Sequence, residues 1–290
     1  MKTQNLNSGF RSNSNGKPPL SIIIPIYNEA ENIGDVIEEV IAKITPLYEL
    51  DLIIVDDGSD DDIFSLLKAK QNQHQELRWI SHPQRSGKSA ALRTGMILAK
   101  NLWVATMDGD GQDDPQNIIK MAQEVDLNDV NDIALVAGNR TSRNDGNNRK
   151  WASSLANGLR QKLLNDDCPD TACGLKLISR DLFLAMPFFD ALHRYLPAFT
   201  THFDFQTVNV PVSNRPRQSG TSKYSNLGRA AAGLFDLCGV IWLMRRTHNP
   251  SISMFIGKAR VEENIPAERK QEVQGTTPGS LLLTTGRAPS

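Results

Sequence analysis

The chain has 290 residues, enough for one large domain or two small ones with a buried core. With 32 basic and 33 acidic residues, its formal net charge is −1, which argues against nucleic acid as a partner. The three cysteines are an odd number and lack metal-ligand spacing, which argues against a disulfide framework and a zinc site. We therefore expect buried or free thiols in a reducing cytosol.

The two ends of the chain lack the periodicity of folded elements. Residues 1–19 are polar, contain no apolar core of a signal peptide, and predict a disordered N-terminal arm. Residues 248–290 are rich in Pro, Thr, Gly and charged side chains and predict a mostly disordered tail. The longest apolar stretch, Ala230–Met244, is interrupted by Asp236. It is shorter than the ~20 residues that span a bilayer, so no transmembrane helix is expected.

Between these ends, buried strands and amphipathic helices alternate. Continuous apolar runs predict strands over Ser21–Pro25, Asp51–Val55, Leu77–Ser81, Leu102–Met107 and Ile133–Ala137. Helical spacing predicts helices over Ala30–Ile44, Ile63–Ala69, Ser89–Ala99 and Ile118–Val125. This order predicts an α/β fold, a doubly wound, mostly parallel sheet with right-handed crossovers and helices on both faces.

After about residue 140 the pattern becomes less regular. A helix is predicted over Lys150–Leu164, followed by a segment with Cys and Gly and then the apolar segments Phe183–Met186 and Val208–Val212. We expect this region to recognise the acceptor of a reaction.

Two carboxylates, Asp108 and Asp110, stand one residue apart directly after the predicted strand Leu102–Met107. Alternate residues of an extended segment point to the same side, so both can face one cation at the carboxyl edge of the sheet. Such oxygen ligands suit Mg²⁺ or Mn²⁺ holding a diphosphate, and Gln112 can add a carbonyl oxygen. The alternative is a solvated acidic turn.

Other predicted strand ends carry residues that can contact a nucleotide. Pro25 ends the first strand, Tyr27 offers a ring for stacking on a base, and Glu29 can accept a hydrogen bond from ribose or base. After the second strand, Asp57 can bind base or ribose. The alternative for each segment is an ordinary turn that caps the following helix.

Two competing motifs do not fit. Paired aspartates after a strand also occur in phosphorylated receiver domains, but the later strand-end lysine of that fold cannot be placed here. The segment Ser86–Ser89 suggests a P-loop, yet His82 stands where that pattern requires glycine. Arg85 and Lys88 remain candidate neighbours of a nucleotide, with solvated loop charges as the alternative.

Eight motifs in order, over about residues 20–245, carry a resemblance to a known family. They are PxYNE, VDDGS, GKSAALRTG, DGDGQDDP, AGNR, DTACGLKLISRDLF, HRYLPAF and RxxGxSKY. Together they resemble family 2 glycosyltransferases of the GT-A fold, in the branch of dolichol-phosphate mannosyltransferases and other polyprenyl-phosphate glycosyltransferases. The resemblance implies a GT-A domain over residues 20–225.

The resemblance also implies the roles of individual residues. Asp110, Arg140 and Arg217 are implied to be catalytic, and the cation ligands are Asp108, Asp110 and Gln112. The acceptor phosphate is assigned to Arg140, Arg149 and Ser153. The nucleotide-sugar is assigned to Pro25, Tyr27, Glu29, Val55, Asp57, Lys88, Asp108, Gly109, Asp110, Arg140, Arg217 and Lys223.

The implied reaction is inverting and metal-dependent, with Mg²⁺ or Mn²⁺. It transfers a hexose, with mannose and glucose as the favoured sugars. The donor is GDP-mannose or a UDP-hexose, and the acceptor is a dolichyl or undecaprenyl phosphate. His193-Arg194-Tyr195 occupies the place where many sugar-acceptor members carry an acidic base. An acceptor phosphate is already ionised at neutral pH and needs positioning rather than deprotonation. Two alternatives remain, transfer to a glycan hydroxyl and an inactive nucleotide-sugar-binding module.

The segment 226–247 is predicted to be an amphipathic helix with Trp242 and with arginines at its ends. Such a helix suits an anionic membrane surface, and the alternative is packing on the catalytic domain or in a dimer. We expect peripheral association with the cytoplasmic face of a membrane.

Overall fold

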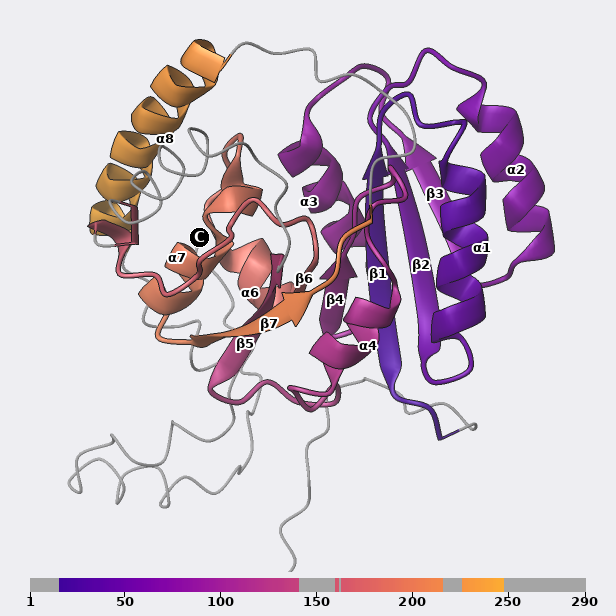
Figure 1. The fold of residues 1–290 in the computed structure, drawn as a ribbon, viewed down its shortest axis with the longest axis horizontal. Helices are drawn as coiled ribbons and strands as arrows, with labels where there is room; N and C mark the ends of the chain where they lie inside the picture. Colours follow the sequence, from indigo (N-terminus) through magenta and orange to yellow (C-terminus); the bar gives the residue numbers. More distant parts are fainter. Residues whose placement is uncertain (1–15, 141–159, 162, 216–225, 248–290) are drawn as a thin grey trace, which may run out of the picture. The chain divides into compact units, whose positions relative to one another are not determined.

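The computed structural model describes residues 16–140, 160–161, 163–215 and 226–247, with only the backbone for 226–232 and 234. The described residues form a sheet of seven strands in the order β3-β2-β1-β4-β6-β5-β7 (Figure 1). The strands are β1 (Pro19–Ile26), β2 (Glu49–Asp56), β3 (Leu77–Ser81), β4 (Trp103–Thr106), β5 (Ile133–Arg140), β6 (Lys176–Ser179) and β7 (Gln206–Val212). Only β6 runs antiparallel to its neighbours β4 and β5 within this sheet. The expected mostly parallel sheet is confirmed.

Helices cover both faces of the sheet. They are α1 (Ile33–Ile44), α2 (Ile63–Gln73), α3 (Lys88–Leu98), α4 (Gln116–Ala122), α6 (Arg180–Ala185), α7 (Leu196–His202) and α8 (Asn226–Arg246), with a 3₁₀ helix at Leu192–Arg194. On one face α1 packs beside α2 and α4, and on the other α3 packs beside α6 and the 3₁₀ helix (Figure 1).

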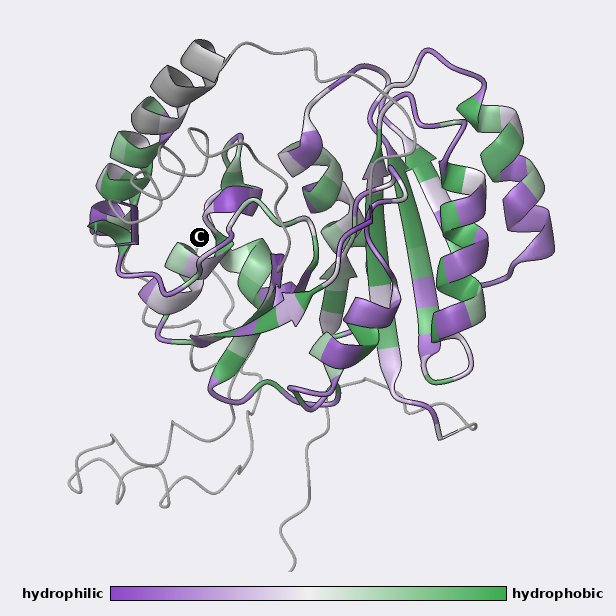
Figure 2. Cartoon of the chain, in the orientation of Figure 1, coloured by the Kyte–Doolittle hydropathy of each residue, from purple (hydrophilic) through white to green (hydrophobic). Residues whose placement is uncertain are grey.

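The apolar runs of the sequence explain the buried sheet. Ile22, Ile23 and Ile24 of β1 are fully buried because helices cover both sides of the strand. The buried residues of α1 recur every three or four positions, so one stripe of the helix faces the sheet while charged residues face solvent. Figure 2 shows this division, with apolar strands in the interior and polar outer sides on α1 and α2.

Most predicted elements are present with shifted ends. The first helix begins at Ile33 instead of Ala30, because the backbone oxygen of Glu29 accepts hydrogen bonds from Asn32 and Ile33 in a preceding turn. The short strand β6 was not predicted, and Phe183–Met186 overlaps the second half of α6. Of the predicted helix Lys150–Leu164, only residues 160, 161, 163 and 164 are described, and they are helical.

The predicted helix near residues 226–247 is α8. Its residues Leu237 and Val240 are buried in the core, and His202 Nε2 lies 2.6 Å from the backbone oxygen of Thr247 just after the helix. None of the helices in the described parts of the chain is long and apolar enough to cross a membrane. β1 begins at Pro19, inside the predicted N-terminal arm; residues 1–15 and 248–290, predicted to be disordered, lie outside the described residues.

Candidate functional site

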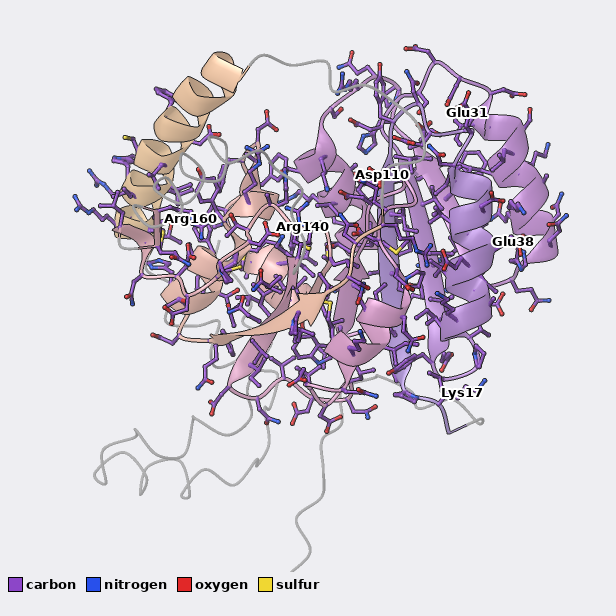
Figure 3. All side chains as sticks on the ribbon, in the orientation of Figure 1. Lys17, Glu31, Glu38, Asp110, Arg140 and Arg160 are labelled. Atoms are coloured by element: carbon purple, nitrogen blue, oxygen red, sulfur yellow. The ribbon has the colours of Figure 1, made fainter. Side chains whose placement is uncertain are left out.

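The carboxyl ends of β1, β2 and β4 meet at one edge of the sheet and border a cavity of about 380 Å³. Three separate sequence motifs therefore converge, as expected for a ligand site of an open α/β sheet. Figure 3 labels Asp110 at this edge and Lys17 at the opposite, amino-terminal end of β1. The cavity is lined by Pro25, Ile26, Tyr27, Glu29, Asp57, Arg85, Gly87, Lys88, Ala91, Asp108, Gly109 and Asp110.

Asp57 holds the loop that closes one side of the cavity. It is 4% exposed, and its carboxylate accepts hydrogen bonds from the backbone N–H groups of Ser86 (2.8 Å) and Gly87 (2.7 Å). His82 Nδ1 lies 2.9 Å from the same carboxylate. Next to it, Gly58 has φ of +73° and packs on the backbone of this loop, where a Cβ would come within 2.8 Å of Arg85 N. Asp57 therefore shapes the cavity wall.

The cavity is also lined by an aromatic side chain, Tyr27, next to Arg85. The guanidinium carbon of Arg85 lies 4.2 Å above the centre of the Tyr27 ring, a cation–π arrangement. The backbone around Tyr27 is fixed to the β2 loop, because Asn28 N donates to Ser59 Oγ at 2.9 Å. Glu29 lines the cavity, and its Oε2 accepts a hydrogen bond from Asn32 Nδ2 at 2.8 Å. A flat ring and a planar cation together suit a nucleobase.

Asp108 and Asp110 line the cavity on the β4 side. Lys88 Nζ donates a short hydrogen bond to Asp108 Oδ1. Burial would raise the pKa of Asp108, but the positive charge and hydrogen bond of Lys88 outweigh it and lower the pKa. The Asp108 carboxyl lies against Gly174, where an added Cβ would be 2.7 Å from its carbon. Gly174 therefore provides the space that this carboxylate occupies.

The loop after β4 is held by Asp113, a residue for which no role was predicted from the sequence. Its Oδ2 accepts a hydrogen bond from Asp108 N at 3.1 Å. Burial and then the negative charge of Asp108 raise the pKa of Asp113 to about 6. The sequence signal that could have indicated Asp113 is its place as the third acidic residue of the DGDGQDD motif.

The same loop is joined to the chain that follows β7. Arg215 N donates to the backbone oxygen of Gln112 at 2.9 Å, and the Arg215 guanidinium binds both Glu39 oxygens at 2.8 and 2.6 Å. Gln112 Nε2 lies 3.4 Å from the Arg215 backbone oxygen. Gln112 is not among the residues that line the cavity. The predicted ligand role of Gln112 therefore stays a prediction.

Two other predicted residues, Val55 and Arg140, are not among the residues that line the cavity. The side chain of Val55 is fully buried in the core, so it offers no contact to a nucleoside through that side chain. Arg140, at the end of β5, forms a two-pronged pair with Asp170, with Nε–Oδ2 2.7 Å and Nη2–Oδ1 2.9 Å. Asp170 was missed as a partner although it opens the DTACGLK motif. Arg149, Ser153, Arg217 and Lys223 lie outside the described residues.

A second group of polar side chains, Ser89, Lys176 and His193, lies near Lys88. Ser89 Oγ is 2.8 Å from His193 Nδ1. Burial, followed by the positive charges of Lys88 and Lys176, lowers the pKa of His193 to about 3. Lys176 is 3% exposed, and its ammonium donates to the backbone oxygens of Thr171 and Cys173. His193 is therefore neutral at physiological pH and a weak base.

The carboxylates present suit a divalent cation that arrives with a diphosphate. Asp108 and Asp110 supply hard oxygen ligands on one wall of the same cavity, and Mg²⁺ commonly uses one or two carboxylates plus substrate phosphates. The described residues contain no group of three or more His, Cys, Asp or Glu side chains arranged to hold a metal. Two carboxylates on one cavity wall match the number that Mg²⁺ commonly uses beside substrate phosphates.

Comparison with known proteins gives the family of the chain. Residues 21–186 match the profile of glycosyl transferase family 2. A dodecaprenyl-phosphate galacturonate synthase of Rhizobium johnstonii is 31% identical over 238 residues, which cover 80% of this chain and 69% of that protein. An undecaprenyl-phosphate 4-deoxy-4-formamido-L-arabinose transferase of Pseudomonas fluorescens is 30% identical over 220 residues. That match covers 75% of this chain but only 63%, less than two thirds, of the transferase.

Solved structures share the fold at lower identity. Glucosyl-3-phosphoglycerate synthase of Mycobacterium tuberculosis, in complex with Mn²⁺, UDP and phosphoglyceric acid, is 20% identical with a TM-score of 0.57 and covers 81% of each chain. The complex with Mg²⁺ and UDP is 22% identical with a TM-score of 0.56, covering 77% of this chain and 80% of that one. The expected GT-A fold is confirmed, and the chain belongs to glycosyltransferase family 2.

Proposed function

We propose that the protein is an inverting, metal-dependent glycosyltransferase that moves a sugar from a nucleotide diphosphate to a polyprenyl phosphate. One observation carries the proposal: a single cavity has an aromatic and cationic face at Tyr27 and Arg85 and two carboxylates at Asp108 and Asp110. A base fits the first part, and a diphosphate with its cation fits the second. Asp108 and Asp110 would hold Mg²⁺ or Mn²⁺, the ions present in complexes of the mycobacterial synthase with the same fold.

The acceptor is supported by the relatives and by the state of His193. Two relatives are named for dodecaprenyl and undecaprenyl phosphate. A sugar hydroxyl needs a general base whose pKa lies near the pH at which the enzyme works. The His193 imidazole, with a pKa of about 3, is too weak for that task. A phosphate monoester is largely ionised at neutral pH and needs no such base. This difference favours the phosphate over a glycan hydroxyl.

In the proposed reaction an oxygen of the acceptor phosphate attacks the anomeric carbon from the side opposite the donor diphosphate. The bond between that carbon and the diphosphate oxygen breaks, and the electron pair leaves with the nucleoside diphosphate. Lys88, which lines the cavity, can bind the departing diphosphate. A divalent cation would neutralise further negative charge on that leaving group. Arg217 and Lys223 are proposed to act there too, and Arg140, Arg149 and Ser153 to hold the acceptor phosphate.

The sequence resemblance and the relatives point to different donor sugars. Mannose or glucose, carried by GDP or UDP, is the expectation from the sequence resemblance. The relatives are named for galacturonate and for 4-deoxy-4-formamido-L-arabinose. A donor screen therefore has to include nucleotide-linked uronic acids and pentoses beside the hexoses.

The outward face of α8 supports contact with a membrane surface. Phe235 is 80% exposed and Trp242 61% exposed, two turns apart on one side of the helix, while Leu237 and Val240 point into the core. Arg245 and Arg246 follow at the exposed end of this helix. We propose that α8 rests on the cytoplasmic face of a membrane, where apolar rings enter the interface and arginines meet anionic headgroups.

The test is a screen of nucleotide-sugars with radiolabelled sugar, in which label is measured in organic-extractable lipid with polyprenyl phosphate, with free polyprenol, and with EDTA. We expect label only with the phosphate acceptor and a divalent cation. Equal transfer to free polyprenol would instead support the hydroxyl-acceptor alternative. Donor binding without transfer or hydrolysis for any pair tested would support an inactive binding module.

A further inference from the structure

Lys88 and Asp108 form an ion pair inside the candidate donor cavity. Lys88 is the first residue of α3, and Asp108 follows β4, so the pair joins two sides of the cavity. The side chains are 34% and 39% exposed, so both remain accessible to a ligand. One Asp108 oxygen is thus already bound to a positive charge at the position where a divalent cation is proposed to bind.

The position of the Asp108 carboxylate is restricted, so it cannot bind Lys88 in one place and a divalent cation in another. It lies against Gly174, with both oxygens within 2.8 Å of the place where a Cβ would be. Its backbone N–H is held by Asp113 at 3.1 Å. Because the ammonium and a divalent cation carry the same sign of charge, they compete for Asp108.

Lys88 has another partner available once the donor is bound. Its long side chain starts beside Gly87, in the loop held by Asp57, and lines the same cavity as both carboxylates. A diphosphate in this cavity brings negative charge within reach of a flexible ammonium. Lysine can therefore exchange a carboxylate partner for a phosphate partner without a change in the fold.

We propose that Lys88 is a place-holder: it neutralises Asp108 before the donor arrives, and it passes to the donor diphosphate when a divalent cation binds that carboxylate. The inference rests on the proposed function of this cavity. It makes Lys88 a diphosphate-binding residue that couples the two ligands. With a cation on Asp108, Lys88 would be available to bind the diphosphate. With a diphosphate on Lys88, Asp108 would be available to bind the cation. Each ligand would therefore strengthen the binding of the other. By thermodynamic reciprocity both affinities change by the same factor.

The test measures binding rather than transfer, with Mn²⁺ and UDP as probes. Electron paramagnetic resonance reports free Mn²⁺, and calorimetry reports UDP affinity with and without Mn²⁺. In the wild type we expect UDP to raise Mn²⁺ affinity by about 5- to 150-fold, the common range for coupled sites. In Lys88→Met, Mn²⁺ alone should bind about two- to fivefold more tightly, because a partly exposed ion pair no longer competes. The enhancement by UDP should fall at least threefold, whereas Lys88→Arg should retain part of it.

A matched control exists on the outer surface. Lys70 binds Glu38 through a 2.6 Å ion pair of similar exposure and is not a cavity residue. Lys70→Met should leave Mn²⁺ and UDP binding as in the wild type. Wild-type Mn²⁺ affinity, or undiminished coupling, in a folded Lys88→Met protein would overturn the place-holder role and leave the proposed function standing. A wild-type protein that binds no Mn²⁺ with UDP and none with GDP would contradict the proposed function itself, and this inference with it.

Discussion

Asp57 binds Gly87 through a hydrogen bond of 2.7 Å from the Gly87 N–H to one carboxylate oxygen, while the other oxygen accepts from Ser86 at 2.8 Å. The carboxylate of Asp57, directly after β2, is therefore bound by backbone N–H groups of the protein itself. We propose that Asp57 contributes to donor binding by holding the loop that carries Arg85 and leads to Lys88.

We expect Asp57→Asn to weaken UDP or GDP binding by about tenfold or more, because an amide offers one acceptor oxygen where two are used, and a lost charged hydrogen bond is worth about 1.5–3 kcal/mol. Calorimetry with the nucleotide, beside a thermal melt, measures the effect. Asp35→Asn, an exposed change on α1, is the control and should bind normally. Unchanged nucleotide affinity in Asp57→Asn would show that the loop is held by other contacts.

Gly174→Ala should impair transfer without unfolding the protein. The new Cβ would meet the Asp108 carboxyl at 2.7 Å, and the flexible end of that side chain can turn away at small cost to stability. Asp108 would then no longer face the cavity, so we expect Mn²⁺ affinity in the presence of UDP to fall about tenfold or more.

Gly34→Ala is the matched control for this steric test. Its Cβ would lie 3.7 Å from Leu66 and 3.8 Å from Lys70, which is ordinary contact. In a helix this change should be neutral or stabilise the protein by up to about 1 kcal/mol. Normal Mn²⁺ binding by Gly174→Ala would refute the steric account of this glycine.

The sequence was informative where apolar runs and motifs coincide. The strand ends near Tyr27, Asp57 and Asp108 were predicted to contact a nucleotide and its cation. In the structure they line one cavity, because parallel strands bring their carboxyl ends to one edge. The partners of these residues were not predictable. Lys88 pairs with Asp108 and Arg140 with Asp170 across 20 and 30 residues, distances over which local patterns carry no information.

The antiparallel strand β6 was missed for a related reason. Its four residues include Lys176, whose charge interrupts the apolar run that marks a buried strand. That lysine is nevertheless buried, because its ammonium binds backbone oxygens of the preceding turn. Only the folded chain shows this compensation.

The low pKa of His193 predicts a specific dependence of stability on pH. Because the folded-state pKa of about 3 lies below the unfolded value near 6.5, the unfolded chain binds more protons between these values. The contribution of His193 is therefore complete above about pH 6.5 and is lost as the pH falls toward 3.

Relative to His193→Gln, the wild-type free energy of unfolding should fall by up to about 1.4 kcal/mol per pH unit below pH 6.5. Urea denaturation at pH 5 to 8 measures this difference. Nuclear magnetic resonance of the imidazole gives an independent readout, and a titration midpoint near 6.5 would contradict the burial of a neutral ring.

The exposed face of α8 can be tested on vesicles. We expect Phe235→Ser with Trp242→Ser to reduce binding to vesicles of phosphatidylcholine with anionic phosphatidylglycerol by about tenfold or more, because two aromatic side chains no longer enter the interface. Ile97→Ser is the control, since Ile97 is 57% exposed and belongs to α3 and not to this helix. Equal sedimentation of the double variant and the wild type would place the membrane contact elsewhere.

The central claim is that Asp108 and Asp110 bind the cation that accompanies the donor diphosphate. The most direct measurement is transfer of radiolabelled sugar to polyprenyl phosphate at saturating Mn²⁺ by the wild type, by Asp110→Ala and by the surface control Asp35→Ala. We expect Asp110→Ala to keep the wild-type melting temperature and lose transfer, while Asp35→Ala stays active. Wild-type turnover by Asp110→Ala would contradict the assignment of the metal and the mechanism built on it.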